Sequence, residues 1–106
     1  FVYLFSATDS AGNKIYKLGS TSNIECRLSQ INRSNPYNLT FSVVSYVPTQ
    51  RKLRDEERFK WALFAFVKRD GLNFVPTSQY EYFETVVSEN YLCTLLEGVV
   101  NAKNFK

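Results

Sequence analysis

The chain contains no histidine and no methionine, and it has only two cysteines among its 106 residues. Without histidine it can be neither a serine–histidine nor a cysteine–histidine hydrolase, and it can form no histidine-based zinc site or histidine-dependent nuclease centre. Two cysteines are also too few for a zinc site with four protein ligands. Any catalytic chemistry must therefore come from tyrosine, lysine, arginine, aspartate and glutamate.

Long apolar runs are absent as well, since none approaches the roughly 18 residues that a membrane span needs. There is no secretory signal and no initiator methionine, so we expect a domain of a longer protein, with no membrane partner. Cys26 and Cys93 are isolated and resemble free, partly buried thiols. Free thiols favour an intracellular setting, either the cytoplasm or the nucleus.

Charge is distributed unevenly along the chain. Residues 1–54 hold seven basic and two acidic side chains, a net charge of +5, whereas residues 55–106 have a net charge of −2. Aromatic residues are frequent, with nine Phe, seven Tyr and one Trp. A basic half with interleaved aromatics suits a polyanionic partner. The alternative is that the overall charge of +3 serves solubility alone.

The start of the chain predicts a β-hairpin. Residues 1–6 and 14–19 have strand-like sequences, and the turn formers of Asp9–Asn13 separate them. With the turn centred near Ser10, Tyr3 lies across from Lys17, and both side chains point to one face of the sheet. Residues 39–47 alternate in polarity and predict a third strand, and residues 80–83 predict a short extended segment.

Three segments have the periodicity of helices: residues 22–33, residues 49–68 and residues 88–102. Pro48 and Thr49 open the second of them. The residues expected to face the core are Ile24, Leu28 and Ile31 in the first helix, Leu53, Trp61 and Phe64 in the second, and Tyr91, Leu95 and Val99 in the third. The prediction is a single α+β domain over residues 1–106, with a small three-stranded antiparallel sheet flanked by helices.

Two basic residues stand out from these patterns. Lys17 lies in an otherwise apolar strand, where an isolated lysine commonly faces outward from a half-exposed sheet. Arg27 borders the buried stripe of the first helix. A guanidinium in that position can be partly shielded and still donate two parallel hydrogen bonds to a phosphate. The alternative is a surface arginine whose stem alone is covered.

Glu57 is the third candidate, because it lies four residues from both Leu53 and Trp61 and so within the predicted buried stripe. A carboxylate on an apolar face costs several kcal/mol unless it is paired or bound to a metal. The alternative is a buried ion pair, with Arg27 as a possible partner. Asp55 and Glu56 are explained as solvated charges at the start of the helix.

Together these residues resemble a known arrangement. The segments Phe1-Val2-Tyr3 and Tyr16-Lys17-Leu18-Gly19 stand where the GIY-YIG nuclease superfamily has its two motifs, and Arg27 follows Gly19 at the usual spacing. A glutamate with aromatics four and seven residues on, and a late Glu81-Tyr82-Phe83, look like a phage and viral branch whose second motif is Tyr-Lys-(Ile/Leu)-Gly. That branch is described as DNA-binding, and the resemblance covers roughly residues 1–85.

The resemblance implies phosphodiester hydrolysis with one divalent metal ion. Tyr3 would orient or help to deprotonate the attacking water, and Arg27 would neutralise charge growing at phosphorus. Glu57 would hold a single Mg²⁺ or Mn²⁺, which acts as a Lewis acid on the leaving oxygen. Such hard cations prefer oxygen ligands, and Mg²⁺ keeps several waters, so one carboxylate suffices.

The chain departs from the superfamily pattern at three positions. Phe1 replaces a glycine, Lys17 replaces the tyrosine two residues before Gly19, and Trp61 replaces the branch's usual histidine after the glutamate. A lysine acts as a base only if its pKa falls from about 10.4, through burial or neighbouring cations. Otherwise Lys17 binds phosphate and leaves the domain catalytically slow.

Three hypotheses follow from the sequence. The leading one is a metal-dependent DNA endonuclease domain, the second is a non-cleaving DNA-binding module on the same fold, and the third is a protein-interaction domain. Glu57 favours the enzyme and Lys17 favours the binding module. We expect the four residues predicted as catalytic, Tyr3, Lys17, Arg27 and Glu57, to converge on one shallow site. The residues predicted to contact nucleic acid are Tyr16, Lys17, Arg27, Arg51, Lys52 and Arg54.

Overall fold

A computed structural model describes residues 1–35, 37–66, 73–74, 82–85 and 87–102 of the chain. Five strands and three helices follow one another in an α+β arrangement, as predicted. The strands are β1 (Val2–Thr8), β2 (Lys14–Ser20), β3 (Ser42–Val47), β4 (Asn73–Phe74) and β5 (Tyr82–Glu84). The helices are α1 (Ile24–Ser34), α2 (Lys52–Phe66) and α3 (Glu89–Ala102). No helix in this described part of the chain is long and apolar enough to span a membrane.

The strands form one antiparallel sheet in the order β3-β1-β2-β5-β4. The three predicted strands correspond to β1, β2 and β3, and β3 is at one edge of the sheet. Beyond β2, the sheet continues with β5 and β4, which the three-strand prediction did not include. In place of 39–47, β3 begins at Ser42. The reason is that the side chains of Asn35 and Asn32 accept hydrogen bonds from the backbone of Leu39 and Phe41, respectively, ahead of the strand.

The hairpin register differs from the predicted one by two residues. Tyr3 lies across from Gly19, and Phe5 lies across from Lys17. The five-residue loop between Thr8 and Lys14 is centred on Ala11 rather than on Ser10, because the Asp9 carboxylate accepts hydrogen bonds from the backbone of Ala11 and Asn13. A shift of two preserves the alternation of a strand. Tyr3 and Lys17 therefore still belong to the same face.

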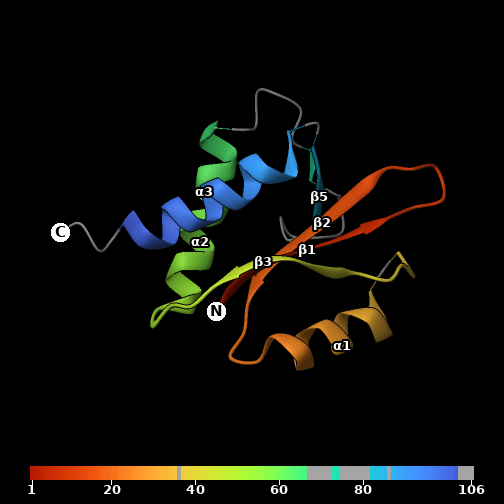
Figure 1. Cartoon of the computed structure of the whole chain (residues 1–106), viewed down its shortest axis with the longest axis horizontal. Coiled ribbons are helices and arrows are strands. Elements are labelled where there is room, and N and C mark those ends of the chain that lie inside the picture. The colour runs from red at the N-terminus through yellow and green to blue at the C-terminus, as the bar shows by residue number, and fades with distance from the viewer. Residues whose placement is uncertain (36, 67–72, 75–81, 86, 103–106) are drawn as a thin grey trace.

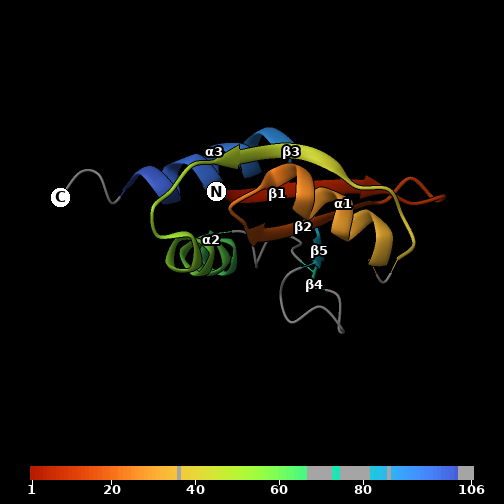
Figure 2. The same cartoon turned by 90° about the horizontal axis from the view of Figure 1, so that it is seen from below.

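Helices cover both faces of the sheet (Figures 1 and 2). On one face lies α1, whose predicted stripe of Ile24, Leu28 and Ile31 packs against a cluster that contains Tyr3 and Phe5. On the other face lie α2 and α3, which enclose a second cluster around Leu4, Leu18 and Phe83 with their own buried residues. Those helix residues are Phe59 and Leu63 in α2 and Leu92 and Leu96 in α3.

The predicted buried face of α2 is wrong. Leu53 and Trp61 are exposed, whereas Asp55, Phe59 and Leu63 are buried. Two residues along a helix correspond to about 200° around its axis, so the buried row is nearly opposite the predicted one. The side chain of Phe64 lies outside the described residues. In α3, Leu95 and Val99 contact the core as predicted, but Tyr91 is exposed.

The environment of Asp55 explains why the hydrophobic periodicity of α2 predicted the wrong buried face. We predicted a solvated charge, but its carboxylate is fully buried and accepts a hydrogen bond from the Thr49 hydroxyl, which also accepts one from the Arg51 backbone. Thr49 thus fixes the chain just before α2 and turns a charged residue inward. A buried carboxylate with such partners is compatible with the core, which an apolar-periodicity argument does not anticipate.

Candidate nucleic-acid site

Tyr3 and Gly19 form a close pair at the start of the hairpin. The Tyr3 ring is completely buried and stacks on Phe5, with ring centroids 4.2 Å apart. A Cβ atom added to Gly19 would lie 2.4 Å from the Tyr3 hydroxyl oxygen and 2.6 Å from the ring carbon that bears it. The second-motif glycine is therefore required because the first-motif tyrosine lies directly over it.

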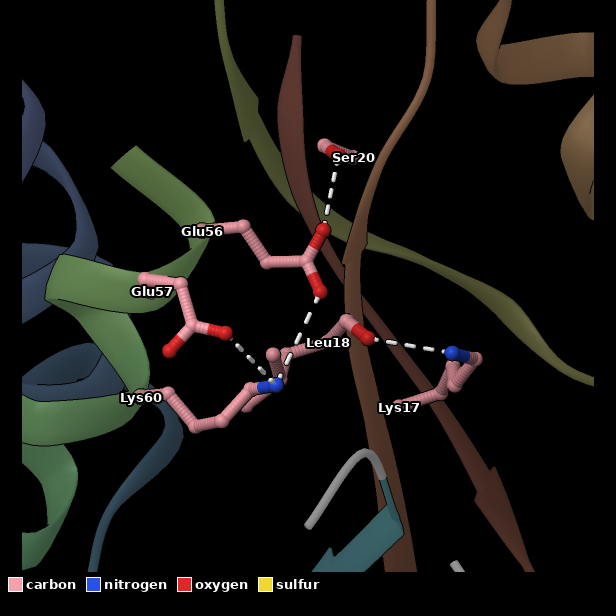
Figure 3. Close-up of polar contacts among 6 residues, drawn as sticks. All are labelled: Lys17, Leu18, Ser20, Glu56, Glu57 and Lys60. Carbon is pink, nitrogen blue, oxygen red and sulfur yellow. Dashed lines mark hydrogen bonds and ion pairs between the residues drawn. The ribbon is translucent and has the colours of Figure 1, made fainter. Parts of the chain in front are cut away.

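Lys17 does not face solvent as an isolated strand lysine would. Only 6% of the residue is exposed. Its ammonium donates a hydrogen bond of 3.1 Å to the Leu18 carbonyl oxygen (Figure 3) and lies 5.2 Å from the centre of the Tyr82 ring. Since β5 places Tyr82 opposite Lys17, the late aromatic motif covers this lysine. Glu81, the first residue of that motif, lies outside the described residues.

Tyr16 is on the opposite face of β2 from Lys17. It is buried in the cluster beneath α2 and α3, where its ring stacks on Phe83 at 5.4 Å. Burial raises the pKa of its phenol above the usual value of 10.0. Tyr16 is therefore on the other face of the sheet from Lys17 and from the helix that carries Arg27.

Arg27 lies where the sequence predicted, at the border of the α1 stripe. Asn23 caps the helix by accepting a hydrogen bond from the Cys26 backbone, which fixes the first turn. Ile24 and Leu28, on either side of Arg27 in the sequence, pack against the cluster of Tyr3. Arg27 itself is half-buried, and its Nε atom is buried without a hydrogen-bond partner among the described residues.

Glu57 is not in a buried stripe. Its side chain is 60% exposed, and one oxygen lies 3.6 Å from the Lys60 ammonium. Its neighbour Glu56 is the glutamate that reaches the hairpin (Figure 3). Only 15% of the Glu56 side chain is exposed; Oε1 accepts a 2.7 Å hydrogen bond from the Ser20 hydroxyl, and Oε2 lies 3.9 Å from the Lys60 ammonium.

The predicted burial of Glu57 is therefore wrong, because Glu56 is the largely buried glutamate and Glu57 is exposed. Sequence reasoning also did not single out Lys60. A sequence signal was present, because apolar Phe59 and Leu63 lie three and seven residues after Glu56, a helical spacing that predicts a shared face. The structure buries both of them. The residue four positions after Glu56 is Lys60, whereas Trp61 is four positions after Glu57. A cation thus stands one helical turn after the glutamate and pairs with it.

Direct contacts connect part of the predicted site. Tyr3 lies on Gly19, Ser20 follows Gly19, and Ser20 binds Glu56. Arg27 comes from the helix that covers the face of Tyr3, whereas Glu57 extends into solvent. At the start of α2, Arg51 and Arg54 are exposed, and the side chain of Lys52 lies outside the described residues.

The oxygen atoms near Ser20 are of the kind that can bind a divalent metal ion. Carboxylate and hydroxyl oxygens are the donors that Mg²⁺ prefers. No group of three or more metal-ligating side chains of the His, Cys, Asp and Glu types occurs in the part of the chain that the structure describes. Glu56 and Glu57 share the Lys60 ammonium, so a metal ion at these oxygens would have to compete with an internal cation.

The sequence matches the family model of the T5orf172 domain over residues 1–99. No curated protein and no solved structure matches the chain significantly.

Proposed function

The chain belongs to the T5orf172 domain family, and on this premise we propose that it is a DNA-binding module with a GIY-YIG-type arrangement of hairpin, arginine helix and glutamate helix. The T5orf172 domain is phage-derived and is found in nuclease-associated proteins. DNA as the partner agrees with the net charge of +5 in residues 1–54. The two free thiols agree with an intracellular location.

Arg27 carries this proposal. Its guanidinium is held by a helix that packs on the hairpin, and its buried Nε has no hydrogen-bond partner among the described residues. A buried charged donor without an acceptor is costly, and an ordered water or a bound anion can supply the missing acceptor. A phosphate oxygen is the acceptor that a planar guanidinium binds best, with two parallel hydrogen bonds.

The start of α2 supplies a second set of phosphate contacts. Arg51, Lys52 and Arg54 lie at or near the helix N-terminus, where the helix dipole disfavours positive charge. Arg51 and Arg54 are exposed, so they serve no core of this domain. Basic residues in a place that is unfavourable for the isolated helix are consistent with an anionic partner that compensates for them.

Three features favour binding over cleavage. The Tyr3 hydroxyl is buried beneath Gly19, so it offers no contact to an attacking water. The Lys17 ammonium, which replaces the second tyrosine, donates to a backbone carbonyl. The Lys60 ammonium lies within 4 Å of both glutamates and offsets one of their two negative charges. Each of these groups would have to change its environment before taking part in hydrolysis.

Metal-dependent DNA cleavage is the second candidate function, and the position of Glu56 beside Ser20 favours it. In that case Glu56, with Glu57 alongside, would hold one Mg²⁺ or Mn²⁺, which supplies Lewis-acid stabilisation of the leaving oxygen. Arg27 would bind the phosphate and neutralise its growing charge. Tyr3 and Lys17 would position the hairpin against the DNA backbone.

DNA binding is tested by titrating labelled duplex at about 50 and 200 mM salt. Contacts to several phosphates predict a loss of affinity of about 10³-fold or more over this range if about six are made. Arg27→Ala should weaken binding at both salt concentrations. Arg33→Ala, which removes an exposed arginine from the last turn of the same helix, is the matched control and should have the smaller effect. Salt-independent binding, or equal effects of the two variants, would contradict the proposal.

Cleavage is tested by incubating the domain with supercoiled plasmid in Mg²⁺, in Mn²⁺ and in EDTA. The binding module leaves the plasmid intact in all three. Metal-dependent nicking that Glu56→Gln abolishes and Glu57→Gln preserves would establish the second candidate instead. Nicking abolished only by Glu57→Gln would place the metal on the exposed glutamate.

A further inference from the structure

A groove between α2 and α3 lies on the side of α2 away from Glu56 and Lys60. It has a volume of about 630 Å³, and its lining includes Arg58, Trp61 and Ala62 from α2 and Tyr91, Thr94 and Gly98 from α3. Trp61 is 64% exposed and Tyr91 is 44% exposed. Two large aromatic rings, contributed by two helices, therefore border the same open groove.

The floor of the groove is made partly by small residues. Gly98 has no side chain, and a Cβ atom added there would meet nothing within 4 Å. Thr94 lies one helical turn before it, and Ala62 is on the facing helix. The small residues keep the groove open beside the two rings, in a volume within the range of small-ligand pockets.

Charge along α2 indicates what kind of ligand enters. Arg54, Arg58 and Trp61 recur at i, i+4 and i+7 and so share one face of the helix. The exposed Arg54 belongs to the basic start of α2, and Arg58 is the charged residue in the groove lining. Neither arginine makes an ion pair within the described residues. Such a row of cations, ending at two exposed aromatic rings, suits a nucleic-acid strand. The phosphates of that strand would lie along the arginines, and one base would stack on the rings.

We infer that this groove binds an unpaired nucleobase of a DNA strand, so that the domain prefers DNA with single-stranded or extrahelical nucleotides over continuous duplex. The inference rests on the DNA-binding function proposed above and adds its substrate class. A base paired within a duplex presents only its edges, whereas an unpaired base exposes the ring face that Trp61 and Tyr91 can stack on. The groove and the site near Ser20 lie on different sides of α2, so their variants report separately.

Trp61 is the only tryptophan of the chain and therefore reports directly on the groove. Three probes of equal phosphate number are titrated while its fluorescence is recorded: a thymidine oligonucleotide, a duplex, and an oligonucleotide of abasic sites. The expected result is strong quenching by the thymidine oligonucleotide only, with the other two bound but not quenching. Quenching of equal depth by the abasic strand, or none by the thymidine strand, would overturn the inference.

Gly98→Leu fills the groove with a better helix former and keeps the tryptophan reporter. It should remove most of the quenching and lower the affinity for the thymidine strand about ten-fold, since stacking of one base commonly contributes that much. Affinity for duplex should stay unchanged. Asn90→Leu, an exposed and uncharged position on the same helix outside the groove lining, is the matched control and should change neither value. Unchanged quenching in Gly98→Leu would refute the site.

The two proposals fail in distinguishable ways. If the domain binds neither duplex nor single strand at low salt, the DNA-binding function is wrong. If it binds both but quenching does not depend on the base, only the groove assignment is wrong. A blue shift of Trp61 emission as protein concentration rises without DNA would assign the groove to a second copy of the chain and would also overturn the inference.

Discussion

Replacing Gly19 with alanine tests whether Tyr3 dictates the glycine of the second motif. The new Cβ would lie 2.4 Å from the tyrosine oxygen and 2.6 Å from its ring carbon, whereas carbon contacts need about 3.5 Å. The ring cannot move aside easily, because it is fully buried and stacked on Phe5. Overpacking of this kind costs about 1–3 kcal/mol. It outweighs the roughly 0.5–1 kcal/mol by which alanine normally stabilises a strand relative to glycine.

The measurement is a double-mutant cycle in which urea unfolding gives the free energy of unfolding of each variant. In the wild-type background, Gly19→Ala should lower the free energy of unfolding by about 1–2 kcal/mol, and each kcal/mol corresponds to about 4–8 °C in Tm for a domain of about this size. In a Tyr3→Leu background the ring atoms are gone, so the same change should become neutral or stabilising by up to about 1 kcal/mol. Gly98→Ala is the control, because its Cβ meets open space and should only stabilise.

Additivity would refute this reasoning. If Gly19→Ala costs the same in the two backgrounds, the tyrosine ring is not what excludes a side chain at position 19. A stabilising Gly19→Ala in the wild-type background would contradict the hairpin register itself, because the close approach depends on Tyr3 lying across from Gly19.

Three further predictions test the core and the titrating groups. Asp55→Ala should lower the free energy of unfolding by about 1–3 kcal/mol, because it removes a buried acceptor of the Thr49 hydroxyl. A loss below about 0.5 kcal/mol in urea unfolding, as for a surface site, would contradict the rotation of α2 that buries Asp55. Burial raises the pKa of the Cys93 thiol, so mass spectrometry during alkylation with iodoacetamide should find the exposed Cys26 modified first; equal rates would argue against the burial. Burial also raises the pKa of the Tyr16 phenol above 10.0, so this phenol ionises first in the unfolded state as pH rises. The contribution of Tyr16 to stability is therefore complete below about pH 10 and declines above it. Tyr16→Phe should flatten the fall of Tm with pH in that range.

Much of the fold follows from local sequence. Strand-forming residues around a turn of Asp, Gly and Asn specify the hairpin, and the spacing of Ile24, Leu28 and Ile31 specifies α1 and its buried side. The shared face of Tyr3 and Lys17 was predictable although the register was not, because an error of two residues leaves the alternation of a strand intact. The same alternation already places Tyr16 and Lys17 on opposite faces of the sheet, as the structure confirms.

The rotation of α2 was decided only by the tertiary structure. This helix has large apolar residues on more than one side, including Leu53, Phe59 and Trp61, so hydrophobic periodicity alone does not select the face that is buried. Packing against both the sheet and α3, together with the Thr49–Asp55 hydrogen bond, selects Phe59. That choice turns Glu56 and not Glu57 toward the hairpin, and it leaves Trp61 exposed. The rotation of one helix, fixed by contacts between residues distant in sequence, therefore determines which glutamate reaches the hairpin.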